Sequence, residues 1–550
     1  MILNITGIRL SLDEGEDKLA AKSAAILSIP REAIVSLRVL RKSIDARRNR
    51  PPFFVYVVEA GLPDNIPLPD LPGGDVVIRV VEEKERLAVS DGVALRKKES
   101  LSYRRLFAAG EGQKVVVVGS GPAGLFAALT LAEKGVPALL LERGKEITAR
   151  CRDVQAFWEK GQLIEESNVH FCEGGAGAFS DGKITSRVKN PCTGMVRETL
   201  VELGAPADIL IDAKPHIGTD RLREVVKNFR EKLLALGCEI RFGARVSDLL
   251  IRAGRVAGVI VNGKEEVKTK CVVLAMGQNS DDTYANLHNR GVRIVPKPFA
   301  MGLRMEHPQG LINEIQYGKW RPHAALPPAD YFLTARVADT DRSVYTFCMC
   351  PGGRIIGCSS EKDVLITNGM SRSLRDGDYA NAAVVVNVRI DDFLGTPQEP
   401  LKGLDFRRKW ETMAFSLGGG DYHAPAQRLT DFLQDRESVK LAPTSFLPGV
   451  KAASLRKTLP DFAAEAIKEG LRQFGRKMPG FITEEAMLVG VETRTSSPVR
   501  ILRDAQGESV NTAGLYPCGE GAGYAGGIIS SALDGIRAAG NLINSLNGHR

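Results

Sequence analysis

Three glycines in the spacing GxGxxG are the residues of this sequence that point most directly to a chemistry. Gly119, Gly121 and Gly124 follow a short β-branched run at 115–118 and open a stretch with helical character at 123–134. In such a turn the first glycine permits a tight bend, the second lets the backbone approach a pyrophosphate, and the third lets the helix pack against the strand. The N-terminus of the helix directs free N–H groups and a positive dipole at phosphate. The pattern therefore predicts a dinucleotide site.

An acidic residue at the end of the next strand supports this prediction. Gly135 ends the helix, and a second apolar strand at 137–141 leads into Glu142. This carboxylate comes about twenty residues after Gly119, where it can accept hydrogen bonds from the ribose hydroxyls of adenosine. It would repel a 2′-phosphate, which disfavours NADP.

The elements that must position this site continue along the chain as an α/β domain. Helices are predicted at 147–161 and 220–236, and strands at 239–242, 245–250, 256–261 and 266–274. The tight turn Asn262-Gly263 is typical of a hairpin, so the last strands form a β-meander. The meander returns the chain to the first sheet at 272–277, where small residues would lie beside the ligand.

Two further glycine-rich segments favour FAD over NAD. In EGGAGAFSDGK at 173–183, small residues let the backbone approach a flat group, while Ser180, Asp181 and Lys183 could bond its polar edge; the alternative is a flexible loop. Near the C-terminus, a strand at 514–521 exposes Glu520, and a helix begins near Gly527. A helix N-terminus at the ring would favour the anionic reduced flavin. A long FAD needs such a second clamp, whereas NAD does not.

Several longer motifs resemble one family. EGGAGAFSDGKITS, KPHIGTDRL, FCMCPGG, GVETRTSSPVRI, YPCGEGAGYAGGIISSALDGI and the early SIDAR are similar to the large bacterial FAD-dependent dehydrogenases of undetermined substrate, within the glutathione-reductase-like FAD-binding fold. The resemblance covers nearly the whole chain and implies non-covalent FAD. Together with the glycine turn, it gives these candidate cofactor residues: Gly119, Gly121, Pro122, Ala123, Gly124, Glu142, Arg143, Gly175, Ala176, Lys183, Val246, Ala275, Gly277, Gly519, Glu520, Gly526, Gly527 and Ile528.

Bulk composition is that of an ordinary globular protein. The chain has 550 residues, enough for about three or four domains. Its longest apolar runs are strand-sized and its N-terminus lacks a basic, apolar leader, so we expect a cytoplasmic protein without a membrane partner. Nine scattered cysteines suggest free thiols. The net charge of +8 is a mild excess that does not demand nucleic acid.

The first hundred residues predict a small α+β module. Strands are expected at 2–12, 33–40, 53–59 and 76–81, and a helix at 16–27. Between strands lie basic residues that could form an RNA or phosphate patch: Arg38, Arg41, Lys42, Arg47, Arg48 and Arg50. A solvated hairpin with basic tips is favoured, because no aromatic residues interleave for base stacking.

The segment from about 280 to 490 carries no second dinucleotide fingerprint. NAD(P)H, if used, would bind transiently against the flavin. A hairpin of 343–350 with 354–359 and a strand at 382–390 predict an antiparallel sheet that roofs the flavin ring, with helices at 406–415 and 461–473. The predicted domains are 1–100, 113–280, 281–485 and 486–550, joined after the first by a linker at 99–113. The fold class is therefore mixed α/β and α+β, with a split Rossmann-like FAD domain, an inserted substrate domain and the N-terminal module.

A few side chains in this segment could do chemistry. Arg494, among hydroxyls in ETRTSSP, is the candidate for orienting a substrate, and a structural arginine joining two domains is the alternative. Cys348 and Cys350 would point to one face of a strand, with Cys358 across the hairpin. The three thiols could form a redox or metal site, but we favour small buried hydrophobic side chains. His216 and His423 lie in loops without metal spacing.

The sequence thus predicts an FAD-dependent oxidoreductase that passes hydride between a small-molecule substrate, or NAD(P)H, and the flavin. No metal is expected. Two alternatives stay open: a flavin-dependent RNA-modifying protein, suggested by the basic cluster, and a non-catalytic flavoprotein that senses redox state or acts as a scaffold. The substrate, the electron acceptor and the oligomeric state do not follow from the sequence.

Overall fold

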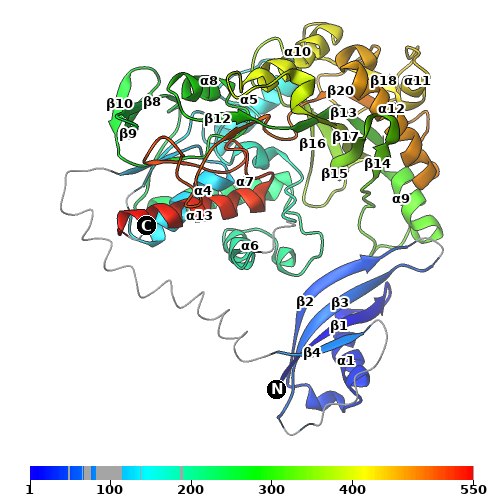
Figure 1. The fold of residues 1–550 in the computed structure, drawn as a ribbon. Coiled ribbons are helices and arrows are strands. Elements are labelled where there is room, and N and C mark those ends of the chain that lie inside the picture. Colours follow the sequence, from blue (N-terminus) through cyan, green and yellow to red (C-terminus); the bar gives the residue numbers. More distant parts are fainter. Residues whose placement is uncertain are drawn as a thin grey trace.

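The computed structural model describes residues 1–47, 50–64, 66, 76–81, 114–136, 138–185 and 190–548. Figure 1 shows a large α/β body and a smaller N-terminal module beside it. The predicted linker at 99–113 and Arg48 lie outside the described residues. Within them, no helix is both long and apolar enough to cross a bilayer.

A five-stranded parallel sheet forms the centre of the body. Its order is β22-β11-β5-β6-β7, with these bounds: β5 Val115–Val118, β6 Ala138–Leu141, β7 Glu239–Arg241, β11 Val272–Leu274 and β22 Leu515–Pro517. Every residue of β5 and β6 is buried. This explains why these strands read as continuous apolar runs rather than alternating ones.

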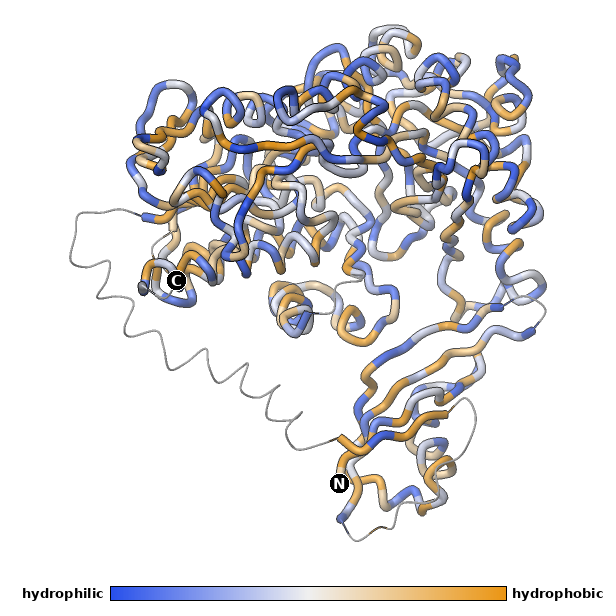
Figure 2. The backbone as a smooth tube through the Cα atoms, in the orientation of Figure 1, coloured by the Kyte–Doolittle hydropathy of each residue, from blue (hydrophilic) through white to orange (hydrophobic). Residues whose placement is uncertain are grey.

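Both faces of this sheet are covered. Val115 and Val117 pack into a core with the helices α4 (Pro122–Glu133), α6 (Cys192–Glu202), α7 (Thr219–Ala235) and α13 (Ile528–Leu546). Val116 and Val118 pack into a second core with α8 (Asp281–Asn289) and the meander of β8 (Val246–Arg252), β9 (Arg255–Val261) and β10 (Glu265–Lys268). Figure 2 shows many hydrophobic residues along the interior segments of the body and hydrophilic ones on its outer loops. The predicted split flavin-type fold is confirmed, although the strand expected at 266–274 is two strands, β10 and β11.

A second, larger sheet lies beside the first. Its order is β14-β15-β17-β13-β20-β18-β19, with β16 paired to β15. Its bounds are β13 Phe299–Pro308, β14 Thr334–Val337, β15 Arg342–Gly357, β16 Thr367–Ser371, β17 Tyr379–Val388, β18 Ala424–Arg428, β19 Val450–Ala452 and β20 Met487–Glu492. β12 Ile294–Pro296 pairs with β21 Val499–Ile501 in a short two-stranded sheet. In the sequence, each of these strands lies between a strand of the parallel sheet and a strand of the larger sheet. The helices of this part are α9 Gln309–Tyr317, α10 Lys402–Leu417, α11 Leu429–Leu433 and α12 Asp461–Lys477.

The predicted hairpin around Pro351-Gly352-Gly353 is wrong. The two expected strands are one strand, β15, which pairs with β17 in its first half and with β16 in its second. Glycine can bulge within a strand when a neighbouring backbone comes close. Here a Cβ on Gly352 would lie 1.7 Å from the carbonyl oxygen of Arg375, so the chain passes this point without reversing. Cys358 therefore lies beyond the end of β15 and not across a hairpin from Cys348.

The N-terminal module is a four-stranded antiparallel sheet with one main helix. Its order is β2-β3-β1-β4, with bounds β1 Ile2–Ser11, β2 Ser36–Asp45, β3 Phe53–Gly61, β4 Val77–Val80 and α1 Leu19–Leu27. The module contacts the body where the backbone of Lys42 bonds Ile211 and Ala213, each at 2.8 Å. It resembles the predicted module, with β2 longer than expected.

The basic cluster lies partly on β2, not between strands as predicted. Arg38 pairs with Glu59 at 3.2 Å, and Lys42 pairs with Glu16 at 2.9 Å. Arg47 and Arg50 each lie 2.5 Å from Asp45. Because acids within the module meet these cations, the cluster does not favour the RNA alternative.

Helices α4 and α13 approach closely through Gly535 (Figure 1). A Cβ on Gly535 would lie 2.0 Å from the carbonyl oxygen of Ala123, at the start of α4. A Cβ on Gly540, one turn further along α13, would meet no described heavy atom within 4 Å. Only the first glycine is needed for the helix contact.

These two glycines make a matched test of that contact. We expect Gly535→Ala to lower the free energy of unfolding by about 1–3 kcal/mol, because the helices must separate. We expect Gly540→Ala to raise it by about 0.5–1 kcal/mol, because alanine loses less entropy in a helix. Thermal and urea unfolding measure both. Equal effects of the two substitutions would contradict the packing described here.

Candidate functional site

A cavity of about 1400 Å³ opens where the parallel strands end. The loops after β5, β6, β11 and β22 line it, together with the 3-10 turn Gly175–Phe179 and part of β15. Its wall includes every predicted cofactor residue except Gly124, and it includes Arg494. Ligands of open α/β sheets bind outside the carboxyl ends of the strands, so this is the expected place for a functional site.

The glycine turn has the geometry that its spacing predicts. Gly119 has φ 94°, and a Cβ there would lie 2.5 Å from the carbonyl oxygen of Ala275. Gly121 faces the cavity opposite Gly175, with a Cβ 3.8 Å from the nearest backbone atom. Gly124 lies beneath the turn, where a Cβ would lie 1.9 Å from the carbonyl oxygen of Gly119. The first two glycines thus shape the cavity, and the third lets α4 begin so close to it.

Glu142 lies at the end of β6, on the cavity wall, and is 4% exposed. Its Oε2 accepts hydrogen bonds from the backbone N and Oγ of Ser120 at 2.9 and 2.6 Å. Its Oε1 accepts from the backbone N atoms of Gly144 and Cys172 at 2.9 and 3.1 Å. The carboxylate is therefore fixed by four protein donors, which hold it beside the glycine turn.

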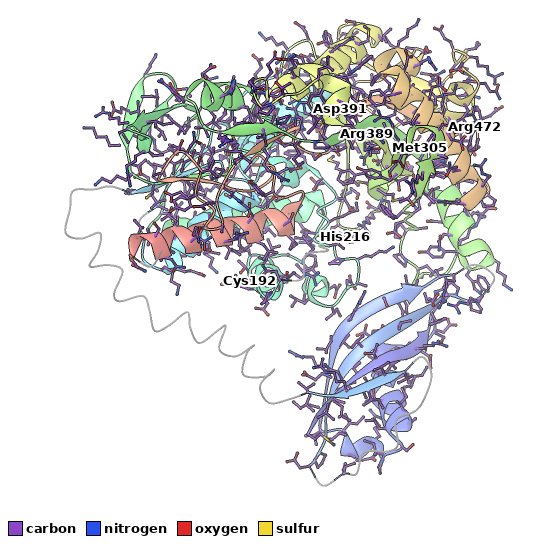
Figure 3. All side chains as sticks on the ribbon, viewed as in Figure 1. Cys192, His216, Met305, Arg389, Asp391 and Arg472 are labelled. Carbon is purple, nitrogen blue, oxygen red and sulfur yellow. The ribbon has the colours of Figure 1, made fainter. Side chains whose placement is uncertain are left out.

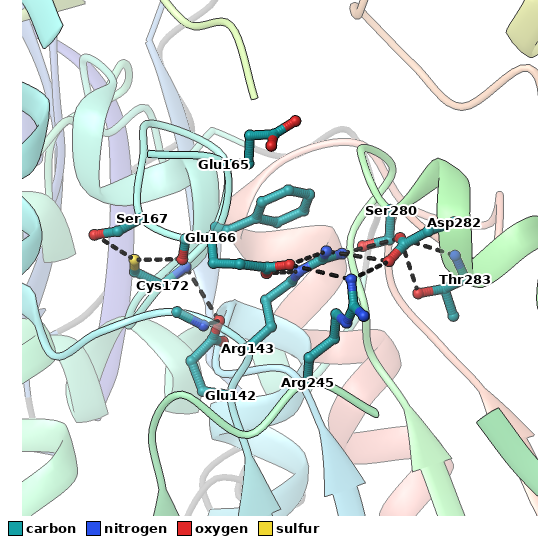
Figure 4. Close-up of polar contacts among 12 residues, drawn as sticks. Glu142, Arg143, Glu165, Glu166, Ser167, Cys172, Arg245, Ser280, Asp282 and Thr283 are labelled. Atoms are coloured by element: carbon teal, nitrogen blue, oxygen red, sulfur yellow. Dashed lines mark hydrogen bonds and ion pairs between the residues drawn. The ribbon is translucent and has the colours of Figure 1, made fainter. Parts of the chain in front are cut away.

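Arg143 and Arg245 form a charge cluster at the same end of the cavity (Figure 4). Arg143 bonds Glu166 at 2.6 Å and Asp282 at 3.0 Å, and Arg245 lies 3.3 Å from Glu166. Burial lowers the pKa of Arg143, but the two acids outweigh burial and raise the pKa above its ordinary value. Because both guanidinium groups already have acidic partners, they do not form a ready site for a 2′-phosphate.

Another part of the cavity wall is formed by the loop before α13, whose Gly519 lies close to Ala123 of α4. Gly519, Glu520, Gly526 and Gly527 line it, and no described side chain caps the N-terminus of α13. A Cβ on Gly526 or Gly527 would meet no atom of the described chain within 4 Å. Free N–H groups and open space together make this helix end an anion-attracting part of the wall.

Gln278 lines the cavity and carries a polar atom without a hydrogen-bond partner. Its Nε2 donates to the carbonyl oxygen of Arg494 at 2.7 Å and to Glu520 Oε1 at 3.1 Å. Its buried Oε1 has no hydrogen-bond partner among the described residues. Buried acceptors are almost always satisfied, so this oxygen fits a polar ligand in the cavity. The cavity therefore fits a long dinucleotide with phosphates near α4 and a second polar portion near α13.

The predicted edge residues Asp181 and Lys183 are paired with each other. Asp181 lies 2.7 Å from Lys183 and 2.6 Å from Arg375. Burial raises the pKa of Asp181, but these cations hold it below its usual range. Asp181 is therefore ionised, and both Asp181 and Lys183 line the cavity.

The large antiparallel sheet, which the sequence predicted as a roof for the flavin ring, contributes a wall of the cavity. It adds apolar side chains at the mouth, Phe332, Tyr345 and Phe347, and polar ones deeper in, Cys348, Asn368 and Glu492. Burial raises the pKa of Glu492 to about 7, with Arg304 at 3.1 Å opposing it. His170 also lines the cavity. The sequence had singled out Cys348 and the ETRTSSP segment that begins at Glu492. No local signal marked the others: Phe332, Tyr345, Phe347, Asn368 and His170.

Arg494 lines the cavity, but its guanidinium bonds the protein. Its Nε and Nη2 donate to the two oxygens of Glu411 on α10 at 2.9 and 2.8 Å. Its Nη1 donates to Asn279, which follows β11, at 3.2 Å. These contacts favour the alternative interpretation, an arginine that joins the two parts of the body. A role in orienting substrate stays a prediction.

The histidines and cysteines singled out in the sequence lie mostly elsewhere. His216 bonds the carbonyl oxygen of Ser373 at 3.0 Å, and His423 pairs with Asp421. Neither histidine is among the residues that line the cavity. Figure 3 labels His216. All nine cysteines have free thiols. The described residues contain no group of three or more His, Cys, Asp or Glu placed to hold a metal.

The pair of Arg494 and Glu411 gives a stability prediction. Glu411→Gln is expected to lower the free energy of unfolding by about 3–5 kcal/mol at neutral pH, because it removes the buried counter-charge of the guanidinium and leaves only the more distant Glu361, at 3.3 Å. Asp330→Asn, which removes the exposed pair with Lys214 (2.8 Å), is the control. Its expected cost is about 0.2–1 kcal/mol. Urea unfolding measures both, and equal costs would contradict the assignment.

The same pair predicts a pH dependence. Burial raises the pKa of Glu411, but Arg494 outweighs burial and lowers it below the ordinary value. The ion pair therefore contributes stability above the ordinary carboxyl pKa and loses it as the pH falls through the lowered pKa. The deficit of Glu411→Gln should shrink in acid, and a deficit that is constant with pH would contradict the ion pair.

Comparisons with known proteins identify FAD-related domains in this chain. Residues 113–155 match an FAD binding domain, residues 298–495 match the C-terminal domain of FAD-dependent proteins, and residues 1–61 match a domain of unknown function. Protein FixC of Escherichia coli K12 is 28% identical over 209 residues, which cover 36% of this chain and 44% of FixC. The FAD-complexed glycerol-3-phosphate dehydrogenase of Bacillus halodurans is 11% identical, with a TM-score of 0.35 over 82% of this chain and 67% of that one.

One relative spans the full length. An uncharacterised protein of Clostridium beijerinckii is 42% identical over 550 residues, which cover 100% of this chain and 99% of that protein. The residues that line the cavity and both matching FAD domains lie within these 550 aligned residues. The chain therefore belongs to the same family as the Clostridium beijerinckii protein, and it carries an FAD binding domain and the C-terminal domain of FAD-dependent proteins.

Proposed function

We propose that this protein is an FAD-dependent dehydrogenase that moves hydride between a small-molecule substrate, or NAD(P)H, and the flavin. One observation carries the proposal: two helix N-termini that no described side chain caps, those of α4 and α13, open into a single cavity. Each attracts negative charge. One suits the pyrophosphate of FAD, and the other suits the pyrimidine end of the ring, where reduction adds negative charge.

The residues of the wall suggest how FAD would be held. Gly119, Gly121, Pro122 and Ala123 would face the pyrophosphate, with Glu142, Arg143 and Val246 around the adenosine. Lys183, Gly175 and Ala176 would lie along the flavin, and Ala275 and Gly277 would flank the middle. The remaining candidates, Gly519, Glu520, Gly526, Gly527 and Ile528, would meet the ring end. All of them line the cavity. Gly124 would act indirectly, by supporting the turn.

The large sheet supplies the space for a substrate. Bound FAD supplies a two-electron hydride acceptor. The wall from Phe332 to Phe347 would exclude water from one side, and Asn368 and Glu492 would bond polar groups of the substrate. With a pKa near 7, Glu492 would exchange a proton at neutral pH. The chain has one dinucleotide fingerprint, so a nicotinamide donor would use this same space for a short time.

The FAD assignment predicts the effect of filling the glycine turn. Gly121 has φ −74° and ψ 179°, which valine adopts readily, and a Cβ there clears the protein by 3.8 Å. We expect Gly121→Val to fold normally and to lose bound FAD, because its methyl groups take the place of the pyrophosphate. The flavin-to-protein absorbance ratio and the melting temperature measure both. Gly194→Ala on α6, which meets no described atom within 4 Å, should keep its flavin. Retention of FAD by Gly121→Val would contradict the assignment.

The dehydrogenase itself is tested by anaerobic reduction of the purified holoprotein. NADH, NADPH and a panel of hydroxy and amino acids are added singly while the flavin spectrum is recorded. We expect at least one donor to bleach the flavin, and Glu492→Gln to lose the part of the rate that titrates near pH 7. Dithionite provides the fully reduced reference. A flavin that dithionite bleaches but no donor in the panel reduces would contradict a dehydrogenase of this kind.

A further inference from the structure

Cys348 and Cys350 lie on a bulge of β15 at the cavity wall. Phe347 pairs with Ala383 and Cys350 pairs with Asn381, so β15 has one extra residue at this point. Cys348 has φ 44°, in the left-handed region that strand residues avoid. Cys348 lines the cavity, whereas Cys350 is 0% exposed behind it. Backbone held in such a conformation is concentrated at functional positions.

The bulge brings the two thiols together. In a straight strand, residues two apart have Cα atoms about 6.6 Å apart, near the upper limit for a disulfide. The left-handed conformation at Cys348 instead redirects its side chain, which accepts a hydrogen bond from the thiol of Cys350. The Sγ of Cys350 already donates to the carbonyl oxygen of Cys348 at 3.2 Å. The two cysteines are therefore already in direct contact.

Two cations lie against the pair. Arg304 Nη2 lies 3.5 Å from the Sγ of Cys350 and donates to the carbonyl oxygen of Cys348 at 2.8 Å. Lys183 Nζ lies 4.0 Å from the Sγ of Cys350. The nearby acids are Asp181, paired with Lys183 and Arg375; Glu492, paired with Arg304; and Glu520 across the cavity. Asp181 is thus shared between Lys183 and Arg375, whereas Glu492 has Arg304 as its ion-pair partner.

These surroundings separate the roles of the two sulfur atoms. A hydrogen bond from Cys350, then the charges of Lys183 and Arg304, lower the pKa of the Cys348 thiol, while burial opposes them. The pKa of Cys350 is raised. By contrast, burial raises the pKa of Cys238 and of Cys271 to about 11. Cys348 reaches the cavity while Cys350 is buried beside it, and a reachable thiol beside a buried one is the arrangement of an attacking and a resolving cysteine.

We propose that Cys348 and Cys350 form a dithiol–disulfide couple, a second two-electron redox centre in the wall of the FAD cavity. On oxidation, a bond forms between the two sulfur atoms and the S–H bond of Cys350 breaks. Bound FAD would take up the two electrons and the Cys350 proton, and a proton still held by Cys348 would go to solvent. Reduction reverses each change. The couple goes beyond the proposed dehydrogenase and does not depend on which donor reduces the flavin.

Alkylation tests the thiolate without reference to the flavin. The holoprotein is reduced, freed of reductant and treated with iodoacetamide from about pH 5 to pH 9, and each cysteine is followed by mass spectrometry. We expect Cys348 to react with a midpoint well below the ordinary thiol pKa of about 8.5. Cys192 on α6, labelled in Figure 3, is the internal reference. Cys350→Ser should raise the midpoint of Cys348. A Cys348 that does not react, or that reacts with the midpoint of Cys192, overturns the proposal.

Electron counting tests the couple itself. The air-oxidised holoprotein is titrated anaerobically with dithionite, and its Cys348–Cys350 peptide is examined by mass spectrometry for the loss of two hydrogen atoms. We expect wild type to take up four electrons per FAD and Cys348→Ser and Cys350→Ser to take up two. The flavin spectrum of each variant shows separately whether FAD is bound, so a failure of FAD binding is distinguishable. Uptake of two electrons by wild type, with both thiols free, overturns the proposal.

Discussion

The parallel pairing of β11 between β5 and β22 is the interaction on which the site depends. Val273 lies between Val117 of β5 and Tyr516 of β22. Parallel strands end at the same edge of a sheet, so the loops that follow these three strands meet. Segments from the beginning and the end of the body thereby form one cavity, and the N-termini of α4 and α13 face it from the same side.

The close contact of α4 and α13 extends this constraint from strands to helices. Small residues at the crossing let the backbone of α13 approach the first turn of α4. The two helices share one core with the sheet, so moving either helix would move its end of the cavity. Dense packing transmits such displacements because interiors have little free volume.

The charged side chains of the cavity wall are mostly bonded to the protein itself. Glu142, Arg143, Asp181 and Arg494 each have partners that fix their position. Groups held in this way need little reorganisation when a ligand arrives, which is the basis of electrostatic preorganisation. The unused bonding capacity lies instead at the helix N-termini and at Gln278. The wall thus combines a rigid polar frame with a few open positions for a ligand.

Local patterns in the sequence determined the flavin-type half of the fold. Short apolar strands, glycines at tight approaches and helical periodicity are properties of a few consecutive residues, so the parallel sheet, the meander, α4 and α13 were predictable, as were the residues around the glycine turn. The tertiary structure alone decided the rest. Arg494 pairs with Glu411 of α10, which is distant in the sequence. β15 continues through a Pro-Gly-Gly segment instead of turning back. Two cations from other strands and loops, Lys183 and Arg304, lie near Cys348. Burial and the pairing of charges depend on segments far apart in the chain, which no local pattern records.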